Sequence, residues 1–354
     1  EASISFPLEI PAGRQGLSPS LALSYSSDGG AGWCGYGWNM SVPSVSIDTR
    51  WGVPSFPANN QEEVYSLNGS PLSQEGGTKG NRAKVVNGAP ELSPRLTSKN
   101  TVRFFERTMN GYKKIERIGL SPRHYVWVET TSNNTKLYYG TLDGTTVDPN
   151  STLEDASGNI VKWGLTKMED QWGNHIKYYY HKDEMTVSAD PTLNPIKDGG
   201  VFLILDRIEY TGFNQDPGQY KVVFESSANR LDATVSMKTG FKVLDDHRLD
   251  KIVVKYGSST IKDYRLYYSE GDFRKTRLDS IAEYRKGSRF YAHDFEYYSG
   301  SLSFGDEQVF PYDNLSTDIT DEISSTLSHI VNPILNVLNA SPIKASSTWG
   351  WSSG

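Results

Sequence analysis

The chain of 354 residues carries 36 Lys and Arg against 42 Asp and Glu, a formal net charge of −6. This balance leaves no basic surface of the kind that nucleic acid requires, and no apolar run approaches the roughly 20 residues of a membrane-spanning helix. The single cysteine excludes an internal disulfide and a cysteine-based metal cluster. The abundance of Tyr (21), Gly (32) and Pro (17) favours an all-β protein with many turns.

The first elements are two short strands joined by a turn. Apolar residues alternate over 6–10 and again over 17–25, on either side of the turn segment 11–16, and such period-2 alternation is typical of half-buried strands. Glycines then interleave with large aromatic residues over 29–38. Glycine permits close approach of backbones and the aromatic rings supply burial, so we predict a buried loop held between strands. Cys34, inside this loop, is expected to be a small buried apolar residue.

This opening resembles the start of the SpvB-type N-terminal domain, which occurs in SpvB-like virulence proteins and in the B components of Tc toxins. The family pattern is P-x-G-x-x-G-L-x-P-x-L-x-L-x-Y-x-S, a glycine-rich gap, and then G-x-G-W-x-L. Met40 stands where leucine is usual, a change that conserves side-chain volume. The likeness is sharpest over residues 1–52 and is weaker to about residue 300. The signature residues are Pro11, Gly13, Gly16, Leu17, Pro19, Tyr25, Gly35, Gly37 and Trp38.

A polar, turn-rich stretch covers residues 55–100, with a short strand expected at 64–67. Pairs of aromatic and β-branched strands follow it and predict successive hairpins. The pairs are 102–105 with 112–115, 125–128 with 137–139, 161–165 with 175–180, 207–210 with 220–224, 248–256 with 264–268, and 277–284 with 291–297.

The later pairs form a degenerate repeat of roughly 30–40 residues. Its first half carries Arg, two aliphatic residues and Tyr, as in 248–256 and 277–284, and its second half is an aromatic strand. Residues 165–180, with Asp170, Gly173 and Asn174, resemble a YD (RHS) repeat. Because a lone hairpin is unstable in water, we predict that the hairpins pair edge to edge into one curved RHS-like sheet, a partial shell.

The end of the chain departs from this pattern. Apolar residues recur at three- and four-residue steps over 317–339, which predicts an amphipathic helix or two short ones. We therefore expect an SpvB-like hairpin shell region at 1–315, a helical connector at 316–340, and the start of a further domain at 341–354. The resemblance implies that this further domain is a β-propeller. A partner-binding role for the helix is the alternative.

Motifs of catalysis are missing from the pattern. Residues 30–35 satisfy G-x-G-x-x-G, but no convincing helix start follows, so we reject nucleotide binding. The six histidines show no metal-ligand spacing, and no G-x-S-x-G elbow occurs. Family members that are ADP-ribosyltransferases carry that activity in a separate C-terminal domain, and its E-x-E signature is absent here. We therefore expect no catalytic residue, cofactor or metal site, and predict that the protein is not an enzyme.

The resemblance implies a structural part of a shell that encloses a toxin or other C-terminal cargo polypeptide of a large secreted bacterial protein. The implied partners are downstream RHS repeats, the propeller and the cargo; nucleic acid and a membrane span are not expected. A secreted or cell-surface location follows. The alternative is a carbohydrate- or cell-surface-binding β module that uses exposed Trp and Tyr, and a hidden hydrolase is a third hypothesis. The cargo, target cell, export route and oligomeric state stay open.

Overall fold

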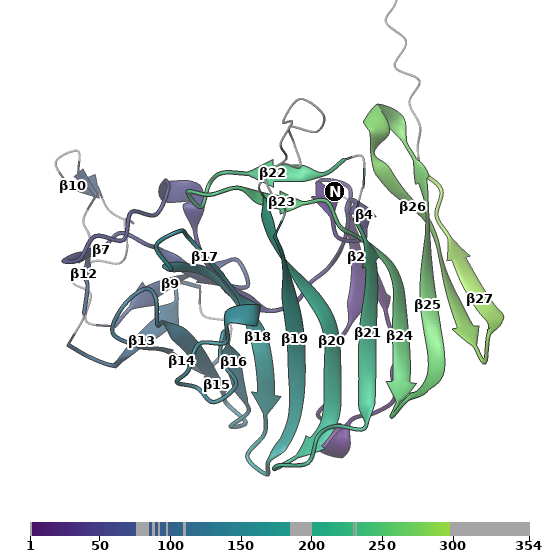
Figure 1. Cartoon of the computed structure of the whole chain (residues 1–354), viewed down its shortest axis with the longest axis horizontal. Helices are drawn as coiled ribbons and strands as arrows, with labels where there is room; N and C mark the ends of the chain where they lie inside the picture. Colours follow the sequence, from purple (N-terminus) through teal and green to yellow (C-terminus); the bar gives the residue numbers. More distant parts are fainter. Residues whose placement is uncertain are drawn as a thin grey trace, which may run out of the picture. The chain divides into compact units, whose positions relative to one another are not determined.

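In the computed structural model, long antiparallel strands form one curved sheet (Figure 1). The structure describes residues 2–75, 85–86, 89–90, 93–96, 98–108, 111–184, 200–228, 230 and 232–297. These residues belong to one compact unit, Glu1–Tyr297. The predicted helical connector at 316–340 and the segment 341–354 lie outside the described residues. The expected all-β class with sequential antiparallel hairpins is confirmed over the described part of the chain.

Hairpins build the larger part of the sheet. Neighbouring strands pair antiparallel in the order β18–β19–β20–β21–β24–β25–β26–β27. The predicted pairs from residue 161 onward are therefore confirmed as neighbours. Their bounds are β18 Ile160–Glu169, β19 Asn174–Glu184, β20 Val201–Phe213, β21 Tyr220–Ser227, β24 Arg248–Tyr256, β25 Ser259–Glu270, β26 Thr276–Arg285 and β27 Ser288–Asp294.

Side-chain alternation sorts these strands into two faces. In β20, Ile208 and Tyr210 are fully buried, whereas Arg207 and Glu209 lie on the other, partly exposed face. There the Arg207 Nε donates to Glu209 at 3.0 Å, and its guanidinium lies 3.9 Å from the centre of the Tyr179 ring. The charged residues of the repeat thus form an outer face, and the aliphatic residues face inward.

Part of the sheet closes on itself as a small barrel. Its strands pair in the ring β6–β8–β9–β13–β14–β15–β16–β18 and back to β6. Closure is possible because β18 pairs with β6 through residues 162–164 and with β16 through residues 165–169. Both hairpins predicted before residue 140 are confirmed, but the closure was not predicted. The further bounds are β6 Ser44–Ile47, β8 Tyr65–Leu67, β9 Ser70–Gln74, β13 Thr101–Glu106, β14 Lys113–Ile118, β15 Val126–Thr131 and β16 Lys136–Tyr139.

The barrel is filled by aromatic rings. Trp127 lies 4.9 Å, between ring centres, from both Tyr65 and Phe104, and 5.9 Å from Trp163. All four are fully buried and meet edge to face. Such pairs contribute about 0.5–1.5 kcal/mol each beyond the area that they bury. The aromatic richness of the sequence therefore serves the interior of this barrel.

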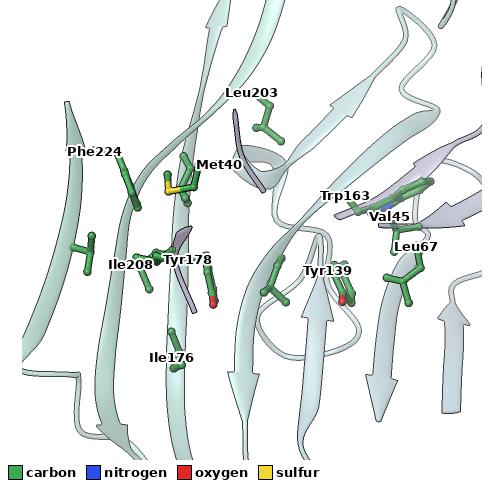
Figure 2. Close-up of a cluster of buried hydrophobic side chains, with 14 of the residues drawn as sticks. Met40, Val45, Leu67, Tyr139, Trp163, Ile176, Tyr178, Leu203, Ile208 and Phe224 are labelled. Atoms are coloured by element: carbon green, nitrogen blue, oxygen red, sulfur yellow. The ribbon is translucent and has the colours of Figure 1, made fainter. Parts of the chain in front are cut away.

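The N-terminal strands cover the inner face of the open sheet. β1 (Ser3–Pro7), β2 (Ala22–Ser26) and β5 (Trp38–Met40) form a separate antiparallel sheet. Leu23 and Met40 of this sheet belong to the same buried cluster as Ile208 and Phe224 of the large one. Figure 2 shows Met40 beside Phe224, Ile208 and Tyr178. The hairpin sheet thus buries its apolar face against the chain's own N-terminal segment.

Short elements complete the described chain. β17 adds to the edge of β18, and β22 pairs with β23 at one end of the open sheet (Figure 1). Their bounds are β3 Ala31–Gly32, β4 Gly35–Tyr36, β7 Asn60–Gln61, β10 Val85–Val86, β11 Ala89–Pro90, β12 Ser93–Pro94, β17 Thr152–Glu154, β22 Thr234–Ser236 and β23 Val243–Asp245, with single 3-10 turns at Arg14–Gly16, Thr49–Trp51, Pro149–Ser151 and Asp272–Arg274.

Candidate functional site on the inner face of the sheet

The glycine-rich segment 29–38 lies against the inner face because its glycines allow close contacts. Gly37 has φ +78°, and a Cβ there would stand 2.6 Å from the Tyr25 ring. A Cβ on Gly32 would stand 2.4 Å from the carbonyl oxygen of Trp38. Only glycine fits both positions without displacement of backbone or ring. This packing gives a physical reason for the glycine and aromatic pattern of the signature.

Two tryptophans fasten this segment to strands far away in the sequence. The Trp38 Nε1 donates to the Tyr297 hydroxyl at 2.7 Å. The Trp33 Nε1 donates to Ser226 Oγ at 3.1 Å, and the Trp33 carbonyl accepts from the backbone N–H of Leu249 at 2.9 Å. Each indole therefore combines burial with a hydrogen bond, the arrangement expected of a buried Trp.

An ion pair on the sheet side completes the attachment. The Arg230 Nη1 donates to the Gly32 carbonyl at 2.6 Å, and its Nε lies 2.8 Å from Asp232 Oδ1. The Asp232 carboxylate also accepts from the backbone N–H and the hydroxyl of Thr276. Burial opposes ionisation of Asp232, but the hydrogen bonds from Arg230 and Thr276 outweigh it and lower its pKa to about 2. The carboxylate is thus ionised in the folded protein and links β26 to the N-terminal segment.

The earlier signature residues form the turn between β1 and β2. The Tyr210 hydroxyl donates to the Pro11 carbonyl at 3.1 Å, and the Tyr264 hydroxyl donates to the Glu9 carbonyl at 2.9 Å. The Gly13 N–H donates to Ser18 Oγ at 2.6 Å. Gly16 has φ +82°, as the end of a single 3-10 turn requires. The turn is thereby bound to two inward-facing tyrosines of the large sheet.

The other signature residues divide into two places. One group lies on or in the buried cluster near the turn or the glycine-rich segment, and the other closes a hairpin elsewhere. Leu17 and Tyr25 are half-buried and pack on the cluster, Pro19 is buried, and Gly35 has φ +107° with its Cα close to the Thr276 carbonyl. Asp170 and Gly173 lie in the turn between β18 and β19, and Asn174 is the first residue of β19.

The degenerate repeat corresponds to a recurring contact. The Tyr268 hydroxyl donates to the Leu249 carbonyl at 2.5 Å, and the Tyr297 hydroxyl donates to the Leu278 carbonyl at 2.6 Å. In both cases the Tyr follows the Leu by 19 residues. The Arg before each Leu lies over the same ring, Arg248 at 4.5 Å from the centre of Tyr268. The Arg-Leu-Asp and Tyr positions of the repeat are therefore structural partners across neighbouring strands.

Asp170 organises the β18–β19 turn. Its Oδ1 accepts from the backbone N–H groups of Trp172 and Asn174 at 2.9 Å each, and its Oδ2 accepts from Asn174 Nδ2 at 2.7 Å. Burial alone would raise the pKa of Asp170, but the hydrogen bonds from Asn174 and the turn backbone lower it below the ordinary value. Gly173 supplies the positive φ of +88°.

A second copy of this turn was missed in the sequence. Asp155 accepts from the N–H groups of Ser157 and Asn159 at 2.8 Å each and from Asn159 Nδ2 at 2.9 Å, and Gly158 has φ +80°. The signal was present as the pentapeptide D-x-x-G-N at both 155–159 and 170–174. It joins β17 to β18, so two successive connections use one turn.

A cavity of about 660 Å³ adjoins the glycine-rich segment. Lys162 of β18 and Asp245 of β23 line it, together with Trp33 and Tyr180. Burial lowers the pKa of Lys162 and raises that of Asp245. The Asp245 Oδ1 has no hydrogen-bond partner among the described residues. The sequence pattern suggests a solvated loop for the acidic pair 245–246 and gives no site role to Lys162, because Lys162 and Asp245 are brought together only by the fold.

One group of side chains could hold a metal ion. Ligand atoms of Asp183, Asp246 and His247 lie within 4.8 Å of one another. The two ring nitrogens of His247 face different carboxylates, Nε2 at 3.3 Å from Asp183 and Nδ1 at 3.0 Å from Asp246. The three residues are also accounted for as an ion-pair group, because a histidine between two carboxylates can be held without a metal. His247 was not among the predicted site residues.

The tryptophans considered for sugar binding differ in exposure. Trp38, Trp127 and Trp163 are buried, as the hairpin reading expected. Trp172 is 60% exposed and Trp51 is 46% exposed. Cys34 is fully buried as expected, and burial raises the pKa of its thiol. Trp349 and Trp351 lie outside the described residues.

The fold of the chain is similar to that of domains in other solved proteins. It is similar to the structure of the N-terminal domain of effector protein SpvB from Salmonella typhimurium strain LT2, with a TM-score of 0.63 at 19% identity, over 84% of this chain and 100% of that one. It is also similar to part of the TcdB2-TccC3-Cdc42 crystal structure, with a TM-score of 0.61 at 17% identity, over 80% of this chain and 15% of that one. A Photorhabdus luminescens Tc holotoxin pore structure gives 0.60 at 17%, over 79% and 14%.

The sequence then identifies the family. Residues 1–287 match the SpvB family, described as Salmonella virulence plasmid 65kDa B protein, and the chain belongs to this family. Curated relatives named mono(ADP-ribosyl)transferase SpvB, from Salmonella typhimurium and Salmonella enteritidis, are 31% identical over 181 residues. That match covers 51% of this chain and 29% of each relative. In the described residues no helix is both long and apolar enough to cross a membrane.

The prediction that the protein is not an enzyme is wrong, because the curated relatives bear the name of an enzyme. That prediction relied on motifs missing from these 354 residues. The matched region is only 29% of the relatives' length, so the motifs of this region do not determine whether the whole protein is an enzyme.

Proposed function

We propose that this chain is a wall-forming module of an SpvB- or Tc-B-like polypeptide that encloses a cargo polypeptide. The curved sheet is the wall, and the N-terminal segment, which packs on its inner face, fixes the curvature of the sheet. The cargo would be a toxic enzyme, of which the relatives' mono(ADP-ribosyl)transferase activity is one example. The protein that contains the module would be a secreted bacterial virulence factor with downstream RHS repeats and a β-propeller.

The attachment of the N-terminal segment is the observation that carries this proposal. Glu9, Pro11, Trp33 and Trp38 each form a hydrogen bond with an open-sheet strand or, for Trp38, with Tyr297 just beyond β27. A sheet fastened at so many points along its width keeps one curvature. A fixed curvature is a property that a wall requires.

The edge of the sheet supports continuation of the wall. Among the described residues β27 pairs only with β26, so its outer backbone groups are available to a further strand. Unpaired edges favour addition of strands. The proposed RHS repeats would extend the sheet at this edge.

Protease protection tests the proposal. A polypeptide that joins this chain to its proposed downstream repeats and a cargo carrying an engineered protease site should resist cleavage at that site. The Trp38→Ala variant, which weakens the attachment of the N-terminal segment to the sheet, should be cleaved faster. The Trp172→Ala variant, which changes an exposed residue, should stay protected. Equal, rapid cleavage of the cargo in all three proteins would refute enclosure.

A second candidate function rests on Trp172. This exposed ring lines a cavity of about 390 Å³ together with the amide side chains of Gln15, Asn133, Asn134 and Gln171. An exposed aromatic face beside amide groups is suited to bind a sugar ring. Titration of the protein with a panel of oligosaccharides should then show binding that Trp172→Ala abolishes. Absence of binding to the whole panel would remove this candidate.

A further inference from the structure

The mouth of the small barrel combines a cavity with cationic side chains. The cavity, of about 440 Å³, is lined by the polar side chains of Arg95, Arg123 and His124 and by the apolar side chains of Phe56, Leu120 and Pro122. No Asp or Glu is among the described residues that line it. The lining therefore combines positive or protonatable groups with apolar side chains.

Arg95 is buried and has hydrogen-bonding capacity left over. Its side chain is 2% exposed. The Nη2 atom donates to both carboxylate oxygens of Glu63, at 2.7 and 2.8 Å, and Nε donates to the Pro57 carbonyl at 2.7 Å. The Nη1 atom has no hydrogen-bond partner among the described residues. Because arginine stays protonated in proteins, this guanidinium brings a full positive charge to the cavity wall.

A second buried cation lies beneath Arg95. Arg117 is fully buried and donates to Gln61 Oε1 at 2.7 Å, while its Nε and Nη2 atoms have no partner among the described residues. Its charge and that of Arg95 both act on the buried Glu63. This one carboxylate thus faces two guanidinium groups. The barrel mouth holds an excess of positive charge that an anion can balance.

The backbone at the cavity wall is strained. Phe56 has φ +49°, a left-handed conformation that a bulky residue rarely adopts. Leu120, opposite in chemistry to the arginines, is 51% exposed although it is a large apolar residue. Residues held in sparsely populated backbone conformations cluster at ligand sites.

We propose that the barrel mouth binds a small organic anion of the phosphomonoester class. The oxyanion contacts Arg123 and His124 beside the buried Arg95 guanidinium, and the organic part lies on Phe56 and Leu120. Arginine suits this task because its planar donors match the geometry of a phosphate group. His124 has its Nδ1 at 2.8 Å from Ser121 Oγ, which leaves Nε2 for the ligand.

Calorimetric titration of the purified chain with phenyl phosphate tests the proposal, with inorganic phosphate and phenol as comparison ligands. We expect phenyl phosphate to bind more tightly than inorganic phosphate, and phenol to show no binding. The double variant Arg123→Gln/His124→Gln, both residues being exposed, should raise the Kd for phenyl phosphate about tenfold or more. Arg274→Gln, the loss of an exposed arginine elsewhere, should leave the Kd unchanged.

A second measurement covers Arg95, whose substitution would also break its ion pair with Glu63. The Nε–Hε resonance of Arg95 should shift on addition of phenyl phosphate and should not shift with phenol. The proposal fails if phenyl phosphate shows no binding, if phenol binds equally well, or if the double variant binds as the parent does. It is independent of cargo enclosure, since it uses this chain alone.

Discussion

At the scale of single residues, steric contact explains why glycine occurs in the glycine-rich segment. Gly37 and Gly257 both have positive φ, but a Cβ on Gly37 would meet the Tyr25 ring at 2.6 Å, whereas a Cβ on Gly257 meets nothing within 4 Å. Gly37→Ala should therefore cost about 1–3 kcal/mol more than Gly257→Ala. Urea denaturation of both variants measures this difference. Equal losses would show that the segment is not packed as described.

We expect neutralisation of two carboxylates, Asp232 and Asp245, to have different effects on the free energy of unfolding. The pKa of Asp232 is lowered to about 2 from 3.8. Its ionised form therefore stabilises the fold above pH 4, and this contribution is lost as the pH falls from about 4 to about 2. Burial raises the pKa of Asp245, so its ionisation costs stability as the pH rises above the unfolded value. At pH 7 Asp232→Asn should lower the free energy of unfolding, and Asp245→Asn should leave it unchanged or raise it.

Unfolding curves at pH 2.5, 4 and 7 check both statements. The loss caused by Asp232→Asn should shrink toward pH 2.5, where the parent carboxylate begins to be protonated. A pH-independent loss, or a destabilised Asp245→Asn, would contradict the assigned directions.

The burial of individual apolar residues was the most predictable property of the site. The burial of Cys34 follows from its place between Trp33 and Gly35, because a small thiol among rings and glycines is most stable out of water. The ionisable groups were not predictable in the same way. Lys162 and Asp245 come from strands far apart in the sequence, so no local spacing announces that they share a cavity.

At the scale of elements, the two D-x-x-G-N turns are a testable unit. Asp170→Ala and Asp155→Ala each remove a carboxylate that accepts three hydrogen bonds. Each should cost about 1–2 kcal/mol of unfolding free energy, as loss of a capping side chain does. Asp272→Ala, the loss of an exposed aspartate in another turn, serves as the control. Losses no larger than the control's would show that these turns do not depend on their Asp.

Hairpins were predictable because their information is local. Each pair is announced by alternating side chains and by Gly, Asn or Asp between the strands, so its register needs no distant partner. Barrel closure was not predictable, because β6 and β18 pair Ser46 with Lys162 across most of the barrel sequence. No sequence pattern in either strand indicates its partner. β18 pairs with β6 up to Gly164 and with β16 beyond it.

At the scale of the whole molecule, the N-terminal segment and the open sheet depend on each other. The strands β1, β2 and β5 have no core of their own, and the inner face of the large sheet would be an apolar surface without them. The Trp38–Tyr297 hydrogen bond joins residues 259 positions apart. Such non-local contacts form late and hold only when the whole unit is folded. The N-terminal segment and the open sheet are thus parts of one cooperative structure.

The labelling rate of the single cysteine measures directly whether the N-terminal segment stays on the sheet. Cys34 lies in the N-terminal segment and is fully buried, so a thiol reagent reaches it only when the segment leaves the sheet. The account predicts that Cys34 in the native protein reacts at the rate of global unfolding, and that the urea dependence of labelling matches the urea dependence of unfolding. Rapid labelling in the absence of urea, with the sheet still folded, would show that the segment is not its cover.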